Sequence, residues 1–182
     1  KTYGSADPAL TYTVAAGSLV GADAFTGALS RVAGENVGAY AINQNTLSAG
    51  ANYAITYASA NLSIGTKAIT VTADAKSKTY GSADPALTYT VAAGSLVGAD
   101  AFTGALNRVA GENVGTYAIN QNTLSAGANY AITYASANLS IGTKAITVTA
   151  DAKSKTYGSA DPALTYTVAA GSLVGADAFT GA

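Results

Sequence analysis

Three acidic side chains carry the clearest potential for chemistry in this sequence. They are Asp84, Asp100 and Glu112, and Gly98-Ala99 stands directly before Asp100. Carboxylates are preferred ligands of calcium, but that ion takes about six to eight oxygen atoms, usually with several acids close together in sequence. Three scattered acids fall short of such a set. We therefore interpret them as solvated or turn-capping residues, because turns favour Asp, and we expect no metal site.

A second possible chemistry is an intramolecular isopeptide crosslink, which needs Lys, Asn and a nearby Glu. Glu112-Asn113 with Lys76 or Lys144 supplies these residue types. Glu112-Asn113 is flanked by glycines, however, which is typical of a turn, and Lys and Glu are rarely fully buried. We interpret them as turn residues and expect no crosslink.

The tyrosines could form a sugar-binding platform. Tyr130 and Tyr134 share a strand face with Ile132, and Leu87–Val91 alternates in the same way. Alternation with apolar partners is typical of a buried face, so core packing is the preferred interpretation. We predict no catalytic, cofactor-binding or metal-binding residues.

Composition excludes several classes of protein. The chain has no His, Cys, Met or Trp, so thiol nucleophiles, histidine bases and the usual zinc sites are absent, and we expect no enzyme and no cofactor. The net charge is −1, which argues against nucleic acid as a partner. No apolar run approaches the roughly 20 residues that span a bilayer, so we expect no membrane insertion. A Cys-free composition rich in Ala, Gly, Ser and Thr suits an exported bacterial protein.

The elements that would position these residues repeat along the chain. The motif KTYGSADP begins at Lys1, Lys78 and Lys155, which are 77 residues apart. The two full periods differ at two positions, where Ser30 and Ala39 are replaced by Asn107 and Thr116. A period this long is close to the size of a small domain.

Within one period the pattern predicts mostly β-structure. Period-two alternation predicts strands at Ala68–Ala75, Leu87–Val91, Thr116–Asn120, Tyr130–Tyr134 and Asn138–Ile141. Lys76–Pro85 reads as the turn between the first two. Ser95–Leu106 is the one segment that could form a short helix, with Ser95 as its N-cap, although Gly98 and Gly104 weaken that prediction.

This order of elements predicts three domains: residues 1–67 as a repeat lacking its first strand, residues 68–144 as a complete repeat, and residues 145–182 as the N-terminal part of a third. Connectors of about three residues cannot behave as flexible coil, so we expect repeats held end to end as a semi-rigid rod. We further expect either that the chain is an excerpt of a longer array, or that the missing strand comes from another chain by donor-strand pairing.

The runs TYGSADPALTYTV, GSLVGADAFTGALSRVAGENVGAYAI, SAGANYAITY and NLSI closely resemble the MBG domain of the YGX type, with Tyr80-Gly81 as the signature pair. This family occurs in tandem in very large bacterial surface and secreted proteins, including filamentous-haemagglutinin-like adhesins. The resemblance implies a small β-rich domain. The predicted order fits a β-grasp-like fold with one short helix and with first and last strands parallel; the alternative is an all-β Ig-like sandwich. The first copy departs from the family pattern, because no AITVTADAKS strand precedes its Tyr-Gly pair.

The leading hypothesis is that these repeats form the stalk of an extracellular bacterial adhesin or secreted filament, at the cell surface or in a biofilm. The alternative is a multivalent binding module, for mucin or other glycans or for further copies of the chain through strand pairing or lateral assembly. Neighbouring repeats are the expected partners in either case.

Overall fold

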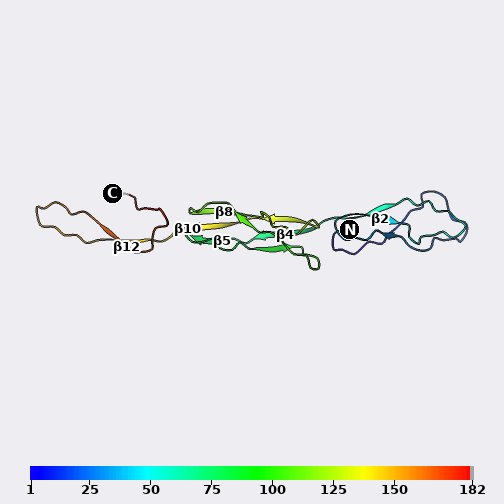
Figure 1. Ribbon diagram of the computed structural model, residues 1–182, viewed down its shortest axis with the longest axis horizontal. Helices are drawn as coiled ribbons and strands as arrows, with labels where there is room; N and C mark the ends of the chain where they lie inside the picture. Colours follow the sequence, from blue (N-terminus) through cyan, green and yellow to red (C-terminus); the bar gives the residue numbers. More distant parts are fainter. Residues whose placement is uncertain (181–182) are drawn as a thin grey trace. The chain divides into compact units, whose positions relative to one another are not determined.

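The fold is mostly β, as the sequence predicts. The computed structural model describes residues 1–180, and within them it contains β-strands and no helix (Figure 1). The strands are β1 Ser30–Arg31, β2 Gly38–Asn43, β3 Ala60–Ile64, β4 Lys67–Ala73, β5 Lys76–Thr79, β6 Tyr89–Ala93, β7 Asn107–Arg108, β8 Gly115–Asn120, β9 Tyr130–Ala135, β10 Ala137–Gly142, β11 Thr147–Ala150 and β12 Tyr166–Ala170.

The chain divides into two compact units, each built from parts of consecutive repeats. The first comprises Lys1–Val71, Val91–Gly104 and Thr123–Tyr134; the second comprises Thr72–Thr90, Ala105–Asn122 and Ala135–Ala182. Each unit therefore includes residues from both sides of one repeat boundary.

The first unit holds the antiparallel sheet β1-β2-β3 and most of a sheet in the order β6-β4-β9. In β4 the buried residues are Ile69, Val71 and Ala73, and the residues between them are less buried. This is the alternation that a half-buried strand requires. The other buried side chains of this unit are Leu47, Ala49, Leu62, Ile64, Leu124, Ala126 and Tyr130.

The second unit holds a sheet in the order β5-β10-β8-β7 and the antiparallel pair β11-β12. Strand β10 lies antiparallel to β8 and parallel to β5, with Leu139 opposite Lys76. The sequence placed Lys76–Pro85 in a turn, which is wrong for its first four residues. The turn begins after Thr79, where Gly81 has a φ of 81° and the Ser82 N–H donates to the Thr79 carbonyl.

The predicted helix at Ser95–Leu106 is also wrong. Gly98 and Gly104 have positive φ values of 56° and 77°, which a right-handed helix does not contain. The Asp100 N–H donates to the Val97 carbonyl at 3.0 Å, closing a turn instead. A Cβ atom at Gly104 would overlap the Thr123 backbone, so close packing against a neighbouring segment fixes this glycine.

The sequence YTVAA is a strand in two of its copies in this chain and not in the other. It forms β6, beside β4, and β12, beside β11. Residues 12–16 have the same sequence but form no strand, and in residues 2–14 only Thr2 makes a bridge, with Gly65. The strand forms where a copy of AITVTADA precedes it and pairs with it, so the partner, rather than local propensity, decides the conformation.

We predict that Val71→Ala destabilises the chain by about 2 kcal/mol, because it removes buried methyl groups and leaves a cavity. Val71 is 0% exposed, whereas Val148, its copy in β11, is 46% exposed. The matched substitution Val148→Ala should change stability by less than about 0.5 kcal/mol. Urea unfolding followed by circular dichroism measures both, and equal effects would contradict the assignment of β4 to the core.

Candidate functional site

Four charged side chains form one ion-pair cluster in the complete repeat. Lys78 Nζ lies 2.6 Å from Asp84 Oδ1, and Arg108 Nε lies 2.5 Å from Asp84 Oδ2. Glu112 pairs with both Lys78 and Arg108. Lys78 lies on β5 and Arg108 on β7, the two edge strands of the sheet, so the cluster connects strands that share no backbone hydrogen bonds.

Arg108 is held in place by backbone and ring contacts as well as by charge. Its Nη1 donates to the carbonyls of Val109 at 3.0 Å and Gly111 at 2.6 Å. Its guanidinium lies 5.5 Å from the centroid of the Tyr117 ring, a favourable cation–π arrangement. Gly111 has a φ of 146°, and a Cβ atom there would overlap the Tyr117 ring. The glycine therefore allows the ring to approach the arginine.

The cluster keeps all four groups charged near neutral pH. Hydrogen bonds from Arg108 and then Lys78 lower the pKa of Asp84 to about 2. Hydrogen bonds from Lys78 and then Arg108 also lower the pKa of Glu112, and those to Asp84 and then Glu112 raise the pKa of Lys78. Amide formation between a lysine and a carboxyl group needs a neutral amine and an uncharged acid. These shifts run the opposite way, so the cluster is suited to holding charge and not to forming a crosslink.

The first repeat carries the same cluster, and the third copy carries a part of it. Lys1 lies 2.6 Å from Asp7, Arg31 lies 2.5 Å from the same carboxylate, and both pair with Glu35. Its Arg31 guanidinium lies over Tyr40, as Arg108 lies over Tyr117.

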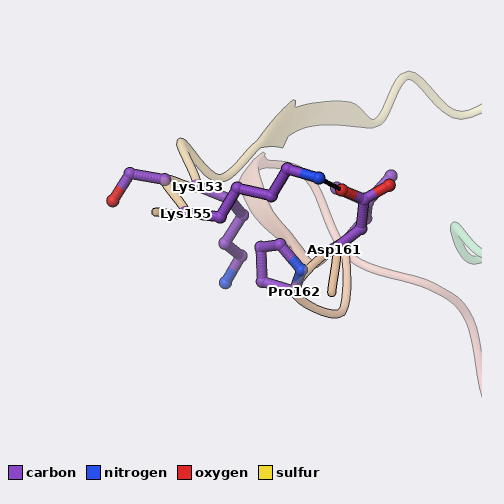
Figure 2. A pocket seen from close by; sticks show the side chains of 6 residues that line it. Lys153, Lys155, Asp161 and Pro162 are labelled. Atoms are coloured by element: carbon purple, nitrogen blue, oxygen red, sulfur yellow. Dashed lines mark hydrogen bonds and ion pairs between the residues drawn. The ribbon is translucent and has the colours of Figure 1, made fainter. Parts of the chain in front are cut away.

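In the third copy Lys155 pairs with Asp161 beside an open cavity of about 260 Å³, with Pro162 next to the pair and the Lys153 ammonium pointing elsewhere (Figure 2). The Lys155 side chain is 46% exposed, against 4% for Lys78. Burial of this lysine therefore accompanies the presence of the arginine and glutamate.

The second recurring feature is the junction between consecutive repeats. In the first unit, the Tyr3 hydroxyl donates to Asp100 Oδ2 at 2.9 Å, and the Tyr130 hydroxyl donates to the same oxygen at 2.5 Å. The Val97 N–H donates to the Tyr130 oxygen at 2.7 Å. The two tyrosine rings meet edge to face with centroids 5.4 Å apart, a favoured geometry for aromatic pairs. Gly4 packs against Val97, where a Cβ atom would overlap the valine methyls.

Asparagine side chains add to this first junction. Asn129 Nδ2 donates to Asn36 Oδ1, and the Val37 N–H donates to Asn129 Oδ1, both at 2.9 Å. The backbone carbonyl of Asn129 accepts from the Lys67 N–H at 2.9 Å. Directional hydrogen bonds therefore join residues 1–67 to residues 68–144.

The second unit repeats the tyrosine contact at the next boundary. The Tyr80 hydroxyl donates to Asp177 Oδ2 at 2.9 Å, and Gly81 packs against Val174. The hydrogen bonds to these aspartates raise the pKa of Tyr3 and of Tyr80. Two copies of these residues outside the two boundaries lack the contact: Val20 is 73% exposed and Tyr157 is fully exposed. The junction, and not the repeat alone, buries these side chains.

The structure places the three candidate cation ligands in different settings. Asp84 and Glu112 belong to the ion-pair cluster, and Asp100 belongs to the first junction. Within residues 1–180, no three acidic side chains are grouped so that they could hold a metal. The sequence indicated neither the cluster nor the junction, because their members lie far apart in the chain.

The remaining candidates are also placed. Lys144 donates to Ser172 at 3.3 Å, and the lysine that pairs with Glu112 is Lys78 and not Lys76 or Lys144. The tyrosine rings of the complete repeat are half-buried or buried: Tyr80, Tyr89, Tyr117, Tyr130 and Tyr134. In the described part of the chain no helix is long and apolar enough to cross a membrane.

Nearly identical β-rich units, joined by contacts that recur at each boundary, define a tandem-repeat module. The chain belongs to the MBG domain family of the YGX type, whose family model matches residues 1–63, 69–140 and 146–182. Comparisons with characterised proteins and with solved structures give no match.

We predict that acid weakens the fold between about pH 4 and pH 2, because Asp84, with a pKa of about 2 against an ordinary 3.8, contributes stability that is lost as the carboxylate protonates. The double variant Arg31→Gln/Arg108→Gln should be less stable at neutral pH and less sensitive to acid over this range. Urea midpoints measured across the pH range test this, with Lys76→Gln/Lys153→Gln, which also removes two positive charges, as the charge-matched control. An unchanged acid sensitivity in the double variant would contradict the role of the cluster.

We also predict that the intact chain carries no isopeptide bond. Its mass should equal the sequence mass, with no loss of ammonia or water, because the pKa shifts in the cluster oppose amide formation. Mass spectrometry of the denatured protein measures this directly. A mass lower by one water or one ammonia per repeat would show that Lys78 or its copy is crosslinked.

Proposed function

We propose that these repeats are a spacer: the stalk of a bacterial extracellular adhesin or secreted filament that holds a separate binding domain away from the cell. The observation that carries the proposal is the recurrence of one junction at both boundaries. The bond from Tyr3 to Asp100 and the bond from Tyr80 to Asp177 have the same length, 2.9 Å. A contact that recurs at each boundary gives every pair of neighbours the same geometry, which a spacer of defined length needs.

The energetic argument also supports a spacer. The connector between β10 and the next copy of AITVTADA is short, so little chain entropy opposes the junction. The junction is held by directional hydrogen bonds, from the Tyr3 hydroxyl and from the buried Tyr130 to the Asp100 carboxylate, and not by apolar contact alone. Directional bonds penalise rotation about the connector, because each needs its donor and acceptor within a narrow range of angles.

The extracellular setting in this proposal comes from the family. Resemblance to repeats of large bacterial surface and secreted proteins supports a surface location, and the lack of cysteine is compatible with export. The half-buried or buried state of the tyrosine rings in the complete repeat supports packing rather than sugar binding as their role. We therefore assign the repeats a mechanical role without catalysis.

We predict that maximum dimension in solution scattering rises linearly with repeat number for arrays of two, four and six repeats. Growth as roughly the square root of repeat number would contradict the spacer, because that is the behaviour of a flexible chain.

The junction itself is tested in the present chain with Tyr80→Phe, which removes the hydroxyl bound to Asp177. Cysteines introduced for spin labels on either side of this boundary meet no native thiol. Tyr80→Phe should broaden the distance distribution between the labels, whereas Tyr157→Phe, at the fully exposed copy, should leave it unchanged. Equal distributions in both variants would contradict a positioning role for the hydroxyl.

A further inference from the structure

A strand near the start of the repeat and the strand at its end are hydrogen-bonded neighbours that run in the same direction. In the second unit, β5 and β10 form a parallel pair, with Lys76 opposite Leu139 and Thr79 opposite Gly142 (Figure 1). The Tyr80 N–H extends this pairing by donating to the Gly142 carbonyl at 2.8 Å. β5 follows β4 directly, and β10 is the last strand before the next copy of AITVTADA.

The same parallel pairing is present in the first unit. Thr2 forms a parallel bridge with Gly65. The Tyr3 N–H donates to the Gly65 carbonyl, and the Gly65 N–H donates to the Lys1 carbonyl, both at 2.9 Å. These residues are copies of residues at the end of β5 and β10. The parallel pairing is therefore a property of the repeat and not of one unit.

The strands that precede β5 and β10 keep the same register. β4 is a neighbour of β9, and in the first unit the Lys67 N–H at the start of β4 donates to the Asn129 carbonyl, directly before β9, at 2.9 Å. This donor and acceptor are as far apart in the sequence as Tyr80 and Gly142 are. One register of pairing thus holds for β4 with β9 and for β5 with β10.

Tension on a chain of such repeats loads this pair along the strands. A pull from the preceding residues reaches β5 at its N-terminal end, Lys76, and a pull from the following residues reaches β10 at its C-terminal end, Gly142. Because the strands are parallel, these two points lie at opposite ends of the pair. A parallel ladder spaces its bonds evenly, so a lengthwise pull loads all of them together, whereas a crosswise pull breaks them one after another.

Side chains oppose sliding of one strand along the other. Leu139 and Ile141 on β10 are 0% and 2% exposed, and a shift in register of one residue, about 3.3 Å, moves the buried side chains of a strand to its solvent face. Lys78 on β5 lies 2.6 Å from Asp84 and also pairs with Glu112, and its side chain is 4% exposed. Moving β5 along β10 therefore breaks ion pairs of a buried lysine together with the backbone ladder.

We propose that the parallel pair β5-β10, together with the ion pairs of Lys78, is a mechanical clamp that resists tension applied along the chain. Bearing load is a different function from spacing, since a spacer needs a defined length at rest and a clamp needs a slow rate of unfolding under force. This inference goes beyond the spacer role, because a flexible array of these repeats would still resist extension. Solution scattering tests the spacer and force tests the clamp, so either can fail alone.

The clamp is tested by pulling the full 182-residue chain in two directions with optical tweezers. Handles attached through Ala75→Cys and Thr143→Cys load β5 and β10 lengthwise. Handles attached through Ser82→Cys and Thr143→Cys follow the C-terminal ends of both strands and load them crosswise. All three positions are exposed, and the chain has no native thiol. At one loading rate, the lengthwise pull should need a several-fold higher force to unfold the chain.

Matched variants test the contribution of the ion pairs. Under the lengthwise pull, Lys78→Gln should lower the unfolding force, because it removes the ion pairs to Asp84 and Glu112. Lys76→Gln makes the same charge change on the same strand but outside the cluster, and it should leave the force unchanged. The two cysteine variants should have equal urea midpoints, which would show that the direction of pulling, and not a difference in stability, sets the force.

Two results would overturn the proposal. The first is an equal unfolding force in the two directions, because the parallel pair would then resist a lengthwise pull no better than a crosswise one. The second is a fall in force for Lys76→Gln as large as that for Lys78→Gln, which would show that loss of charge on β5, and not loss of the ion pairs, weakens the chain.

Discussion

The pairing of β4 with its neighbours is the interaction on which the rest of the structure depends. Ile69 and Val71, which alternate along β4, are buried, and β6 and β9 pair with its two edges. Residues 12–16 show the dependence directly, since the same sequence is a strand only where a copy of β4 lies beside it. Strand formation here is a pairwise property, in agreement with the strong context dependence of β-propensity.

The ion-pair cluster stabilises the edges of a small, alanine-rich sheet. A core of this size provides limited stability. The cluster ties edge strands β5 and β7 together through Lys78, Asp84 and Arg108. Hydrogen bonds from Arg108 to two carbonyls and its position over Tyr117 restrict the arginine. A restricted arginine loses less rotamer entropy in making each ion pair.

Much of the fold could be predicted from sequence, because strand alternation is a local signal. Ala68–Ala75 was placed within two residues of the observed strand, and the repeat showed that one period describes the others. The helix at Ser95–Leu106 failed because its glycines adopt φ values set by distant packing contacts. The cluster was missed because Lys78 and Arg108 are adjacent only once the sheet has formed. Long-range proximity leaves no trace in a local pattern.

The first junction has a consequence for the order in which the chain becomes structured. Tyr3 needs Asp100 and Tyr130, so it reaches its final contacts only after more than a hundred later residues have been made. At ordinary rates of translation that interval is on the order of ten seconds. During it, identical segments from neighbouring repeats compete for the same positions. The two substitutions between the full periods lie at Ser30 and Ala39, outside the junction, so they do nothing to distinguish the correct neighbour from a later one.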